Sequence, residues 1–229
     1  MDRYSEVTNK NVREIVLLKS FPCIWGRCSF CDYILDNSTS EEEINNTNFE
    51  VLENITGKYK VLEVINSGSC FEIPKATLLK IKGIIKEKNI EKLFLESHWS
   101  YRNRVQEIRD FFEIPVIFKI GVESFDYEFR NEFLNKNAKF KDIEELKKYF
   151  DSPCIMVGIK GQTKEMIDKD IEIVLNNFNH ATINVFVNNT TSLKRDDELV
   201  KWFTEKYKFL DESCKIEVLH NNTDFGVGD

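Results

Sequence analysis

Short apolar runs alternate with amphipathic stretches along the whole chain. The runs that predict strands are residues 14–19, 61–65, 93–95, 116–120, 154–157, 181–187 and 216–219. Between them, apolar residues recur at spacings of three and four, as Leu78, Ile81 and Ile85 do, which is typical of a helix with one buried face. This alternation of strand and helix predicts an α/β protein with a parallel sheet.

Polar residues mark several of the predicted helix starts. Residues 37–40 precede three acids at 41–43, Pro74 begins the next amphipathic stretch, and Thr163 caps a helix that extends to about Phe178. Further helices are predicted over residues 102–112 and 194–210. Right-handed crossovers curl such a series into a barrel or part of one, although periodicity leaves a doubly wound open sheet as the alternative.

Composition restricts the class of protein. Hydrophobic residues make up 41% and charged residues 31% of the 229 residues, which is typical of a folded globular chain. No linker or low-complexity stretch divides the sequence, so we expect a single domain over residues 1–229. The net charge of −7 disfavours a nucleic-acid partner, because an acidic protein repels phosphates.

The sequence also bears on location. The chain has no apolar run approaching the ~18 residues of a membrane span, and residues 1–6 do not resemble a signal peptide. Three of the six cysteines lie in one short loop, a usage that fits a reducing compartment. We therefore expect a cytoplasmic protein.

The stretch FPCIWGRCSFCD at residues 21–32, here called the cysteine loop, contains the strongest chemical signal. Cys23, Cys28 and Cys31 have the spacing C-x4-C-x2-C. An odd number of neighbouring thiols cannot all form disulfides, and a structural zinc site requires a fourth ligand. A [4Fe–4S] cluster held by three thiolates leaves one iron open to another ligand. The alternative is three buried thiols in a turn.

The cysteine loop resembles the cluster loop of the radical S-adenosylmethionine enzymes, whose usual spacing is C-x3-C-x-aromatic-C. Phe30 stands at the aromatic position, which lies beside the adenine, while the first gap is one residue longer here. The resemblance implies a partial (βα)6 barrel with a [4Fe–4S] cluster and S-adenosylmethionine as cofactors. It also implies a 5′-deoxyadenosyl radical that abstracts a hydrogen atom, and a reducing electron donor as partner.

The resemblance assigns cofactor contacts to the ends of the second and fourth predicted strands. Ser67, Gly68 and Ser69 stand where the family has the segment that binds the methionine amino group, without its usual Gly-Gly-Glu form. Glu123 stands where the family has a ribose-binding polar residue. The alternatives are a plain turn at residues 67–69 and a solvated acid before a helix at Glu123.

Three later residues complete the implied cofactor site. Lys136 resembles the basic residue that pairs with the methionine carboxylate, and Met156 and Val187 stand beside the adenine in the family. By themselves, Lys136 would be a surface charge, and the two apolar residues would belong to the core.

Glu96 and His98 follow the strand at residues 93–95 and are the candidate catalytic residues. Active sites of parallel α/β proteins form at the carboxyl ends of their strands. The alternative for His98 is an exposed histidine after a strand.

Residues 23–34 are also similar to the small queuosine lyases of queuine salvage. This implies a lyase that releases queuine from queuosine or its 5′-phosphate, with a small-molecule nucleoside or nucleotide as substrate. The secondary ammonium of queuine calls for a carboxylate, with Asp32 and Glu72 as further candidates, and a phosphate calls for a basic residue. The basic candidates are Arg27, Lys119 and Lys160. Two other classes remain open: a radical enzyme that modifies tRNA or a peptide, and a non-enzymatic iron–sulfur or zinc-binding module.

Overall fold

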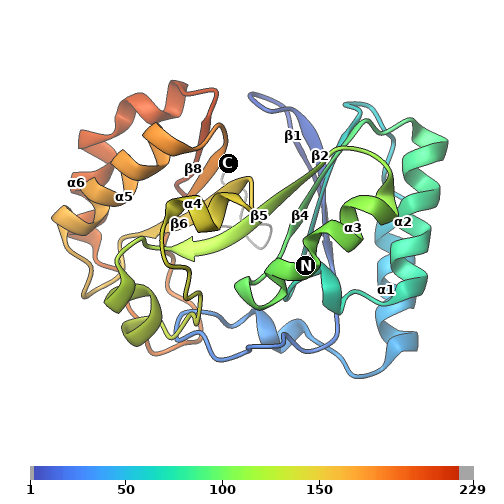
Figure 1. Cartoon of the computed structure of the whole chain (residues 1–229), viewed down its shortest axis with the longest axis horizontal. Helices are drawn as coiled ribbons and strands as arrows, with labels where there is room; N and C mark the ends of the chain where they lie inside the picture. Colours follow the sequence, from blue (N-terminus) through green and yellow to red (C-terminus); the bar gives the residue numbers. More distant parts are fainter. Residues whose placement is uncertain (1–2, 222–229) are drawn as a thin grey trace. The chain divides into compact units, whose positions relative to one another are not determined.

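The computed structural model describes residues 3–221 (Figure 1). The chain divides into two compact units, and each is described by itself. The first unit comprises residues 1–26 and 33–119, and the second comprises residues 27–32 and 120–229. Within the described residues, no helix is long and apolar enough to cross a membrane. A single domain over residues 1–229 remains a prediction.

The strands are hydrogen-bonded neighbours in chain order, from β1 to β8. A doubly wound sheet reverses its strand order at a switch point, and this order has no reversal. The prediction of an α/β fold of the partial (βα)6-barrel type is therefore confirmed, and the open-sheet alternative is excluded.

The first unit contains the amino-terminal strands. Strand β1 (Tyr4–Val7) pairs antiparallel with β2 (Arg13–Leu18), and β3 (Val61–Asn66), β4 (Lys92–Glu96) and the start of β5 (Val116–Glu123) follow in parallel. The helices are α1 (Glu41–Leu52), α2 (Lys75–Lys88) and α3 (Val105–Phe112), with 3-10 turns at Tyr33–Asp36, Cys70–Glu72 and Trp99–Arg104. Helices α1 and α2 lie side by side (Figure 1).

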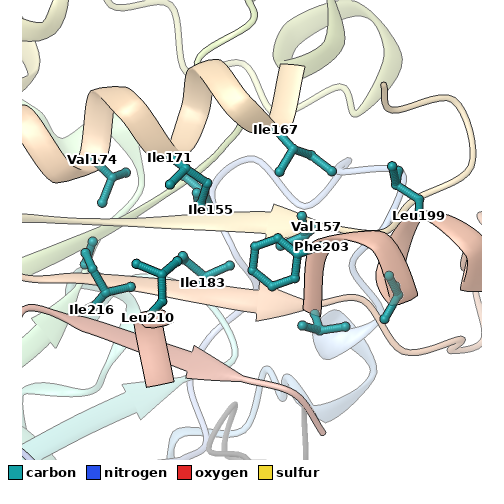
Figure 2. Packing of buried hydrophobic residues seen from close by; sticks show 13 residues of the cluster. Ile155, Val157, Ile167, Ile171, Val174, Ile183, Leu199, Phe203, Leu210 and Ile216 are labelled. Atoms are coloured by element: carbon teal, nitrogen blue, oxygen red, sulfur yellow. The ribbon is translucent and has the colours of Figure 1, made fainter. Parts of the chain in front are cut away.

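The second unit contains β6 (Ser152–Val157), β7 (Ala181–Val185) and β8 (Ile216–Leu219), which are parallel. Its helices are α4 (Ile143–Lys147), α5 (Lys164–Asn177) and α6 (Asp197–Lys206), with a π-helical turn at Phe129–Phe133 and a 3-10 turn at Lys208–Glu212. Figure 2 shows the apolar cluster that joins α5 and α6 to the strands, in which Phe203 packs among Val157, Ile183 and Leu199.

The helix starts predicted at residues 37–40, at Pro74 and at Thr163 are confirmed. The Ser40 side chain accepts the Glu43 N–H at the start of α1, and the Thr163 side chain accepts the Met166 N–H at the start of α5. Pro74 occupies the N-cap position of α2.

Several elements differ from the predictions. Strand β7 ends at Val185 rather than at residue 187, α6 begins at Asp197 rather than at residue 194, and α3 begins at Val105 rather than at residue 102. Strand β1 was not predicted, because Tyr4–Val7 is a short edge strand with no buried residue to produce an apolar signal. The final helix ends at Lys206 rather than near residue 210, since a separate 3-10 turn follows. Strand β5 continues to Glu123, beyond the predicted end at residue 120.

Candidate active site

The cysteine loop begins in the first unit and continues in the second. Cys23, Cys28 and Cys31 form no disulfide among the described residues, and each is of intermediate exposure. Gly26 has φ +57°, a left-handed conformation that favours glycine between the first two cysteines. The Cys31 N–H donates to the Cys28 carbonyl at 3.2 Å, so these two residues share one turn.

Side chains of the first unit hold the start of the cysteine loop. The Cys23 N–H donates to Asn37 Oδ1 at 3.4 Å, and the Ile24 N–H donates to Glu72 Oε1 at 2.8 Å. Asn37 Nδ2 also donates to the Ser67 carbonyl at 2.8 Å. Asn37 was not predicted as a site residue, because nothing in its spacing indicates a contact with the loop. Its amide connects the cysteine loop to the end of β3.

Residues 67–69 are built into this arrangement. The Glu72 carboxylate accepts the Ser69 N–H, and the Ser69 Oγ accepts the His98 N–H at 2.9 Å. A Cβ on Gly68 would lie 2.5 Å from Glu72 Oε2 and 3.5 Å from the Cys23 Cα, so this position requires glycine. The structure therefore places Ser67, Gly68 and Ser69 against the cysteine loop. Their contact with the methionine amino group remains a prediction.

Glu72 has a different environment from the one expected of an ammonium-binding acid. It is buried, and burial raises the pKa of its carboxyl group, although N–H donors from Ser69 and Ile24 and the Tyr101 hydroxyl oppose the shift. With those donors in place, Glu72 acts as an anchor of the cysteine loop.

His98 is buried, with 8% of its surface exposed, so the alternative of an exposed histidine is excluded. Its Nδ1 accepts the Ser100 N–H at 3.2 Å and lies 2.9 Å from Ser100 Oγ. Its ring is nearly parallel to the indole of Trp25, with an interplanar angle of 4° and ring centroids 6.5 Å apart. Trp25 was not predicted as a site residue.

Contacts within the second unit hold the rest of the cysteine loop. The Ser29 N–H donates to the Leu134 carbonyl at 3.0 Å, and Asn189 Nδ2 donates to the Phe30 carbonyl at 2.7 Å. Asp32 Oδ2 accepts the Thr190 N–H at 3.0 Å. Asp32 therefore fixes the loop, and we do not retain it as a candidate for the queuine ammonium.

Glu123 and Lys136 form an ion pair, with Nζ 2.7 Å from Oε1. Glu123 is 4% exposed and has φ +65°, so it is not the solvated acid before a helix that was the alternative. The side chain of Lys136 is 13% exposed, so it is not a surface charge either. Burial alone would lower the pKa of Lys136, but the Glu123 carboxylate and the Cys28 thiolate outweigh it and raise that pKa.

The aromatic and apolar candidates of the second unit are Phe30, Met156 and Val187. Of these, only Phe30 and Met156 belong to one apolar cluster among the described residues. Lys136 Nζ lies 5.4 Å from the centre of the Phe30 ring, so Phe30, Glu123 and Lys136 are brought together. Met156 is buried in a cluster against which Phe30 packs. Val187 is 40% exposed and lies beyond the end of β7, where its adenine contact remains a prediction.

The residues present fit a [4Fe–4S] cluster. Three partly exposed cysteines that form no disulfide among the described residues lie on one short loop, and hydrogen bonds fix the backbone at both ends of that loop. The Lys136 cation favours the thiolate forms of Cys28 and Cys31, which are the forms that bind iron.

Comparison with known proteins decides the family. No protein-family model matches the chain. A solved structure of a queuine lyase from Clostridium spiroforme, bound to S-adenosylmethionine and queuine, is 55% identical with a TM-score of 0.97. The match covers 100% of both chains. This chain belongs to the queuine lyase family. Membership confirms the predicted radical S-adenosylmethionine class and, with it, the two predicted cofactors.

Two other proteins show weaker similarity to this member of the queuine lyase family. An uncharacterized protein of Methanocaldococcus jannaschii is 29% identical over 146 residues, which is 56% of this chain, and the chain spans only 40% of that relative's length. The radical S-adenosylmethionine methyltransferase TsrM from Kitasatospora setae is 10% identical with a TM-score of 0.46, over 74% of this chain and 35% of that one.

Proposed function

We propose that this protein is a queuine lyase that releases queuine from queuosine or queuosine 5′-phosphate by a radical S-adenosylmethionine reaction. The observation that supports this most is the 55% identity, over the whole of both chains, to a queuine lyase bound to queuine. The partly exposed cysteine loop and the buried Glu123–Lys136 pair supply the groups that such a reaction requires.

Cys23, Cys28 and Cys31 would hold the cluster. When bound, the cluster supplies the electron that cleaves S-adenosylmethionine to methionine and a 5′-deoxyadenosyl radical. The hydrogen bonds from Ile24 to Glu72 and from Ser29 to Leu134 keep the cysteine backbone in place. This positioning matters because the ligand atoms must be held before the cofactor binds.

Glu123 and Lys136 would bind S-adenosylmethionine from the second unit. The ion pair uses Oε1 of Glu123, so Oε2 is placed to accept a hydrogen bond from a ribose hydroxyl. The raised pKa keeps Lys136 protonated, and its ammonium group would pair with the methionine carboxylate. Ser67, Gly68 and Ser69 would contact the methionine amino group, and Phe30, Met156 and Val187 would contact the adenine.

The substrate would bind at the end of β4, where Glu96 and His98 remain the proposed catalytic residues. The Glu96 side chain is 34% exposed and lies 3.7 Å from Lys119 Nζ. A carboxylate there suits the secondary ammonium of queuine. Lys119 is itself buried against Glu63, so Arg27 and Lys160, which are exposed, are the better candidates for a 5′-phosphate.

The proposed step begins with transfer of a ribose hydrogen atom to the 5′-deoxyadenosyl radical, which gives 5′-deoxyadenosine. Loss of that hydrogen atom would allow the bond from ribose to base to break and leave an unsaturated sugar. The base would take up one further electron from the external donor and one proton, and would leave as queuine. The protein positions the substrate and excludes water, and an external one-electron donor provides the reducing power.

The test is an anaerobic incubation of the reduced, cluster-loaded enzyme with S-adenosylmethionine and, separately, queuosine, its 5′-phosphate and intact tRNA. We expect mass spectrometry to detect queuine and 5′-deoxyadenosine with the nucleoside or nucleotide. Release from tRNA alone would contradict the proposed substrate, and 5′-deoxyadenosine without queuine would contradict the lyase activity.

A variant with all three cysteines of the loop changed to alanine is the matched control. It should bind no cluster and release no queuine, while its circular dichroism spectrum stays that of the wild type. Retention of about four irons per chain in this variant would exclude these residues as the cluster ligands.

A further inference from the structure

The rings of Trp25 and His98 are parallel but do not overlap fully. Aromatic carbons in direct contact lie about 3.5–4.0 Å apart, so two fully overlapping rings would have centroids at that spacing. Here the centroids are 6.5 Å apart at an interplanar angle of 4°. Each ring therefore covers at most part of the other's face, and Trp25 is partly exposed. The part of the indole face that His98 does not cover can stack against a third ring.

The His98 side of this pair is held rigidly. The Ser69 hydroxyl accepts the main-chain N–H of His98 at 2.9 Å, and the ring Nδ1 accepts the Ser100 N–H at 3.2 Å. An Nδ1 that accepts leaves the proton of a neutral imidazole on Nε2. The ring orientation is thus set by hydrogen bonds that also cap the following 3-10 turn.

The Trp25 side is part of the cysteine loop, and its neighbours are also fixed. Trp25 lies between Cys23 and Cys28 in the sequence, and the preceding residue, Ile24, donates its N–H to Glu72. A ring stacked on Trp25 would consequently lie against the cysteine loop, at a position two residues from Cys23.

The polar side chains nearby suit a base that carries a cationic arm. Glu96 is the last residue of β4, and His98 follows it as the N-cap of the next 3-10 turn, so both residues lie at the carboxyl end of this strand. The Glu96 carboxylate is therefore placed to receive an ammonium group from a ligand whose ring lies against the aromatic pair.

We propose that Trp25 and His98 form the platform on which the 7-deazaguanine ring of queuine stacks, with Glu96 facing its cationic arm. This inference rests on the proposed function and adds the site that selects the base. Stacking recognises the planar heteroaromatic ring, and the carboxylate recognises the arm, so the two contributions are separable.

The test measures equilibrium binding of queuine to cluster-loaded enzyme with S-adenosylmethionine and without reductant. Trp25→Ala should weaken queuine binding about 5- to 150-fold, which is the range found for loss of one base–aromatic stack. Trp25→Phe should lose much less. Because the ring makes the contact, Trp25→Ala should weaken binding of 7-deazaguanine, which lacks the arm, by a similar factor.

His98→Asn is the second variant, chosen because asparagine is also a strong N-cap residue and keeps an acceptor for the Ser100 N–H. It should weaken the binding of both ligands without lowering the melting temperature. Trp202→Ala is the matched control on α6, where Trp202 packs edge-on against Tyr207, and it should leave queuine binding unchanged. Queuine should also quench the fluorescence of the wild type more than that of Trp25→Phe.

The outcomes separate this inference from the proposed function. If the wild type binds queuine and both Trp25→Ala and His98→Asn bind it equally well, the platform is overturned while the lyase proposal stands. If the wild type binds S-adenosylmethionine but neither binds queuine nor releases it, the proposed function itself fails. Should Trp25→Ala not load the cluster, His98→Asn and the fluorescence difference decide the question.

Discussion

The interiors of the two units satisfy their polar groups differently. In the first unit, the buried Glu63 carboxylate bonds to both Arg13 Nε and Lys119 Nζ, each at 2.5 Å. Burial alone would raise the pKa of Glu63, but Lys119 and Arg13 outweigh it and lower that pKa to about 2. The buried Glu14 similarly accepts hydrogen bonds from the Thr56 and Gly57 N–H groups.

The second unit leaves several buried polar atoms without a protein partner among the described residues. Thr182 Oγ1 and Asn184 Oδ1 are two such atoms, and they lie on the same face of β7. Asn131 Nδ2 and Oδ1 also have no hydrogen-bond partner among the described residues. In the described part of the first unit, Asn66 Oδ1 is the corresponding case.

This difference indicates that the two units have different roles. An unsatisfied buried polar group costs about 1–3 kcal/mol, so it persists where water or a ligand completes it or where the structure tolerates the cost. The first unit satisfies most of its buried polar groups and fixes the start of the cysteine loop through Glu72 and Asn37. The second unit retains buried polar atoms in its sheet that have no hydrogen-bond partner among the described residues. The two units should consequently respond differently to the same kind of substitution.

The largest contrast concerns the buried carboxylates. Glu63→Gln leaves Arg13 and Lys119 buried beside a neutral side chain, and loss of one partner of a buried pair costs about 3–5 kcal/mol. We expect that loss in the free energy of unfolding, measured with urea under anaerobic conditions, with the affinity for S-adenosylmethionine unchanged. Glu107→Gln, which removes an exposed pair with Arg104, should not change stability. Equal stability of Glu63→Gln and wild type would contradict this expectation.

Glu123→Gln should, unlike Glu63→Gln, weaken the binding of the cofactor, in addition to any loss of stability from breaking the pair with Lys136. If Glu123 binds the ribose, the substitution should weaken S-adenosylmethionine binding by about 1.5–3 kcal/mol, as for a lost hydrogen bond to a charged group. Isothermal titration calorimetry of the cluster-loaded enzyme measures this change. Unchanged affinity would assign the Glu123–Lys136 pair a purely structural role, like that of Glu63.

Asp170 on α5 provides a pH-dependent contrast. Burial raises the pKa of Asp170 from its ordinary value of 3.8 to about 6, although Ser124 and the Phe125 N–H oppose the shift. Nearby Asp126 raises this pKa further, whereas Arg130 lowers it. Between these two pH values the folded protein binds more protons than the unfolded chain, so this group makes the protein less stable as the pH rises.

Asp170→Asn should remove that dependence while its Oδ1 still accepts the Phe125 N–H. Its stability relative to wild type should increase by about 1 kcal/mol between pH 5 and pH 7, as followed by urea unfolding. Asp168→Asn on the same helix is the control. Hydrogen bonds from Lys206 and Tyr207 outweigh burial and lower the pKa of Asp168, so its effect should be constant over this range. If the stability difference between Asp170→Asn and wild type did not change with pH, the raised pKa of Asp170 would be refuted.

The sequence predicted the elements far better than it predicted these environments. Strand and helix positions follow from local periodicity, and the cysteine spacing alone indicated the cluster. The Glu123–Lys136 pair and the Trp25–His98 pair join residues 13 and 73 positions apart. Such contacts depend on how the chain turns after each strand, which no local pattern specifies. Glu72 shows the same limit, because its type suggested a ligand contact and its burial makes it an anchor.

The smallest predicted effect compares two buried threonines directly. In the first unit, Thr77 Oγ1 donates to Asn45 Oδ1 at 2.8 Å and accepts from Asn48 Nδ2 at 3.3 Å. In the second, Thr182 Oγ1 has no partner among the described residues. Valine has nearly the same shape as threonine, so Thr77→Val should lose about 1 kcal/mol of stability, whereas Thr182→Val should be neutral or gain up to about 1 kcal/mol.

Paired urea denaturation curves of the two valine variants measure this difference without any ligand. A water or a bound molecule that hydrogen-bonds to Thr182 Oγ1 would make Thr182→Val destabilising, because valine would then remove a hydrogen bond rather than an unsatisfied hydroxyl. Repeating the Thr182→Val measurement with saturating S-adenosylmethionine and queuine locates that partner. If Thr182→Val loses stability only when the ligands are present, the Thr182 hydroxyl is completed by a bound ligand. If it loses stability without them, the hydroxyl is completed by ordered water.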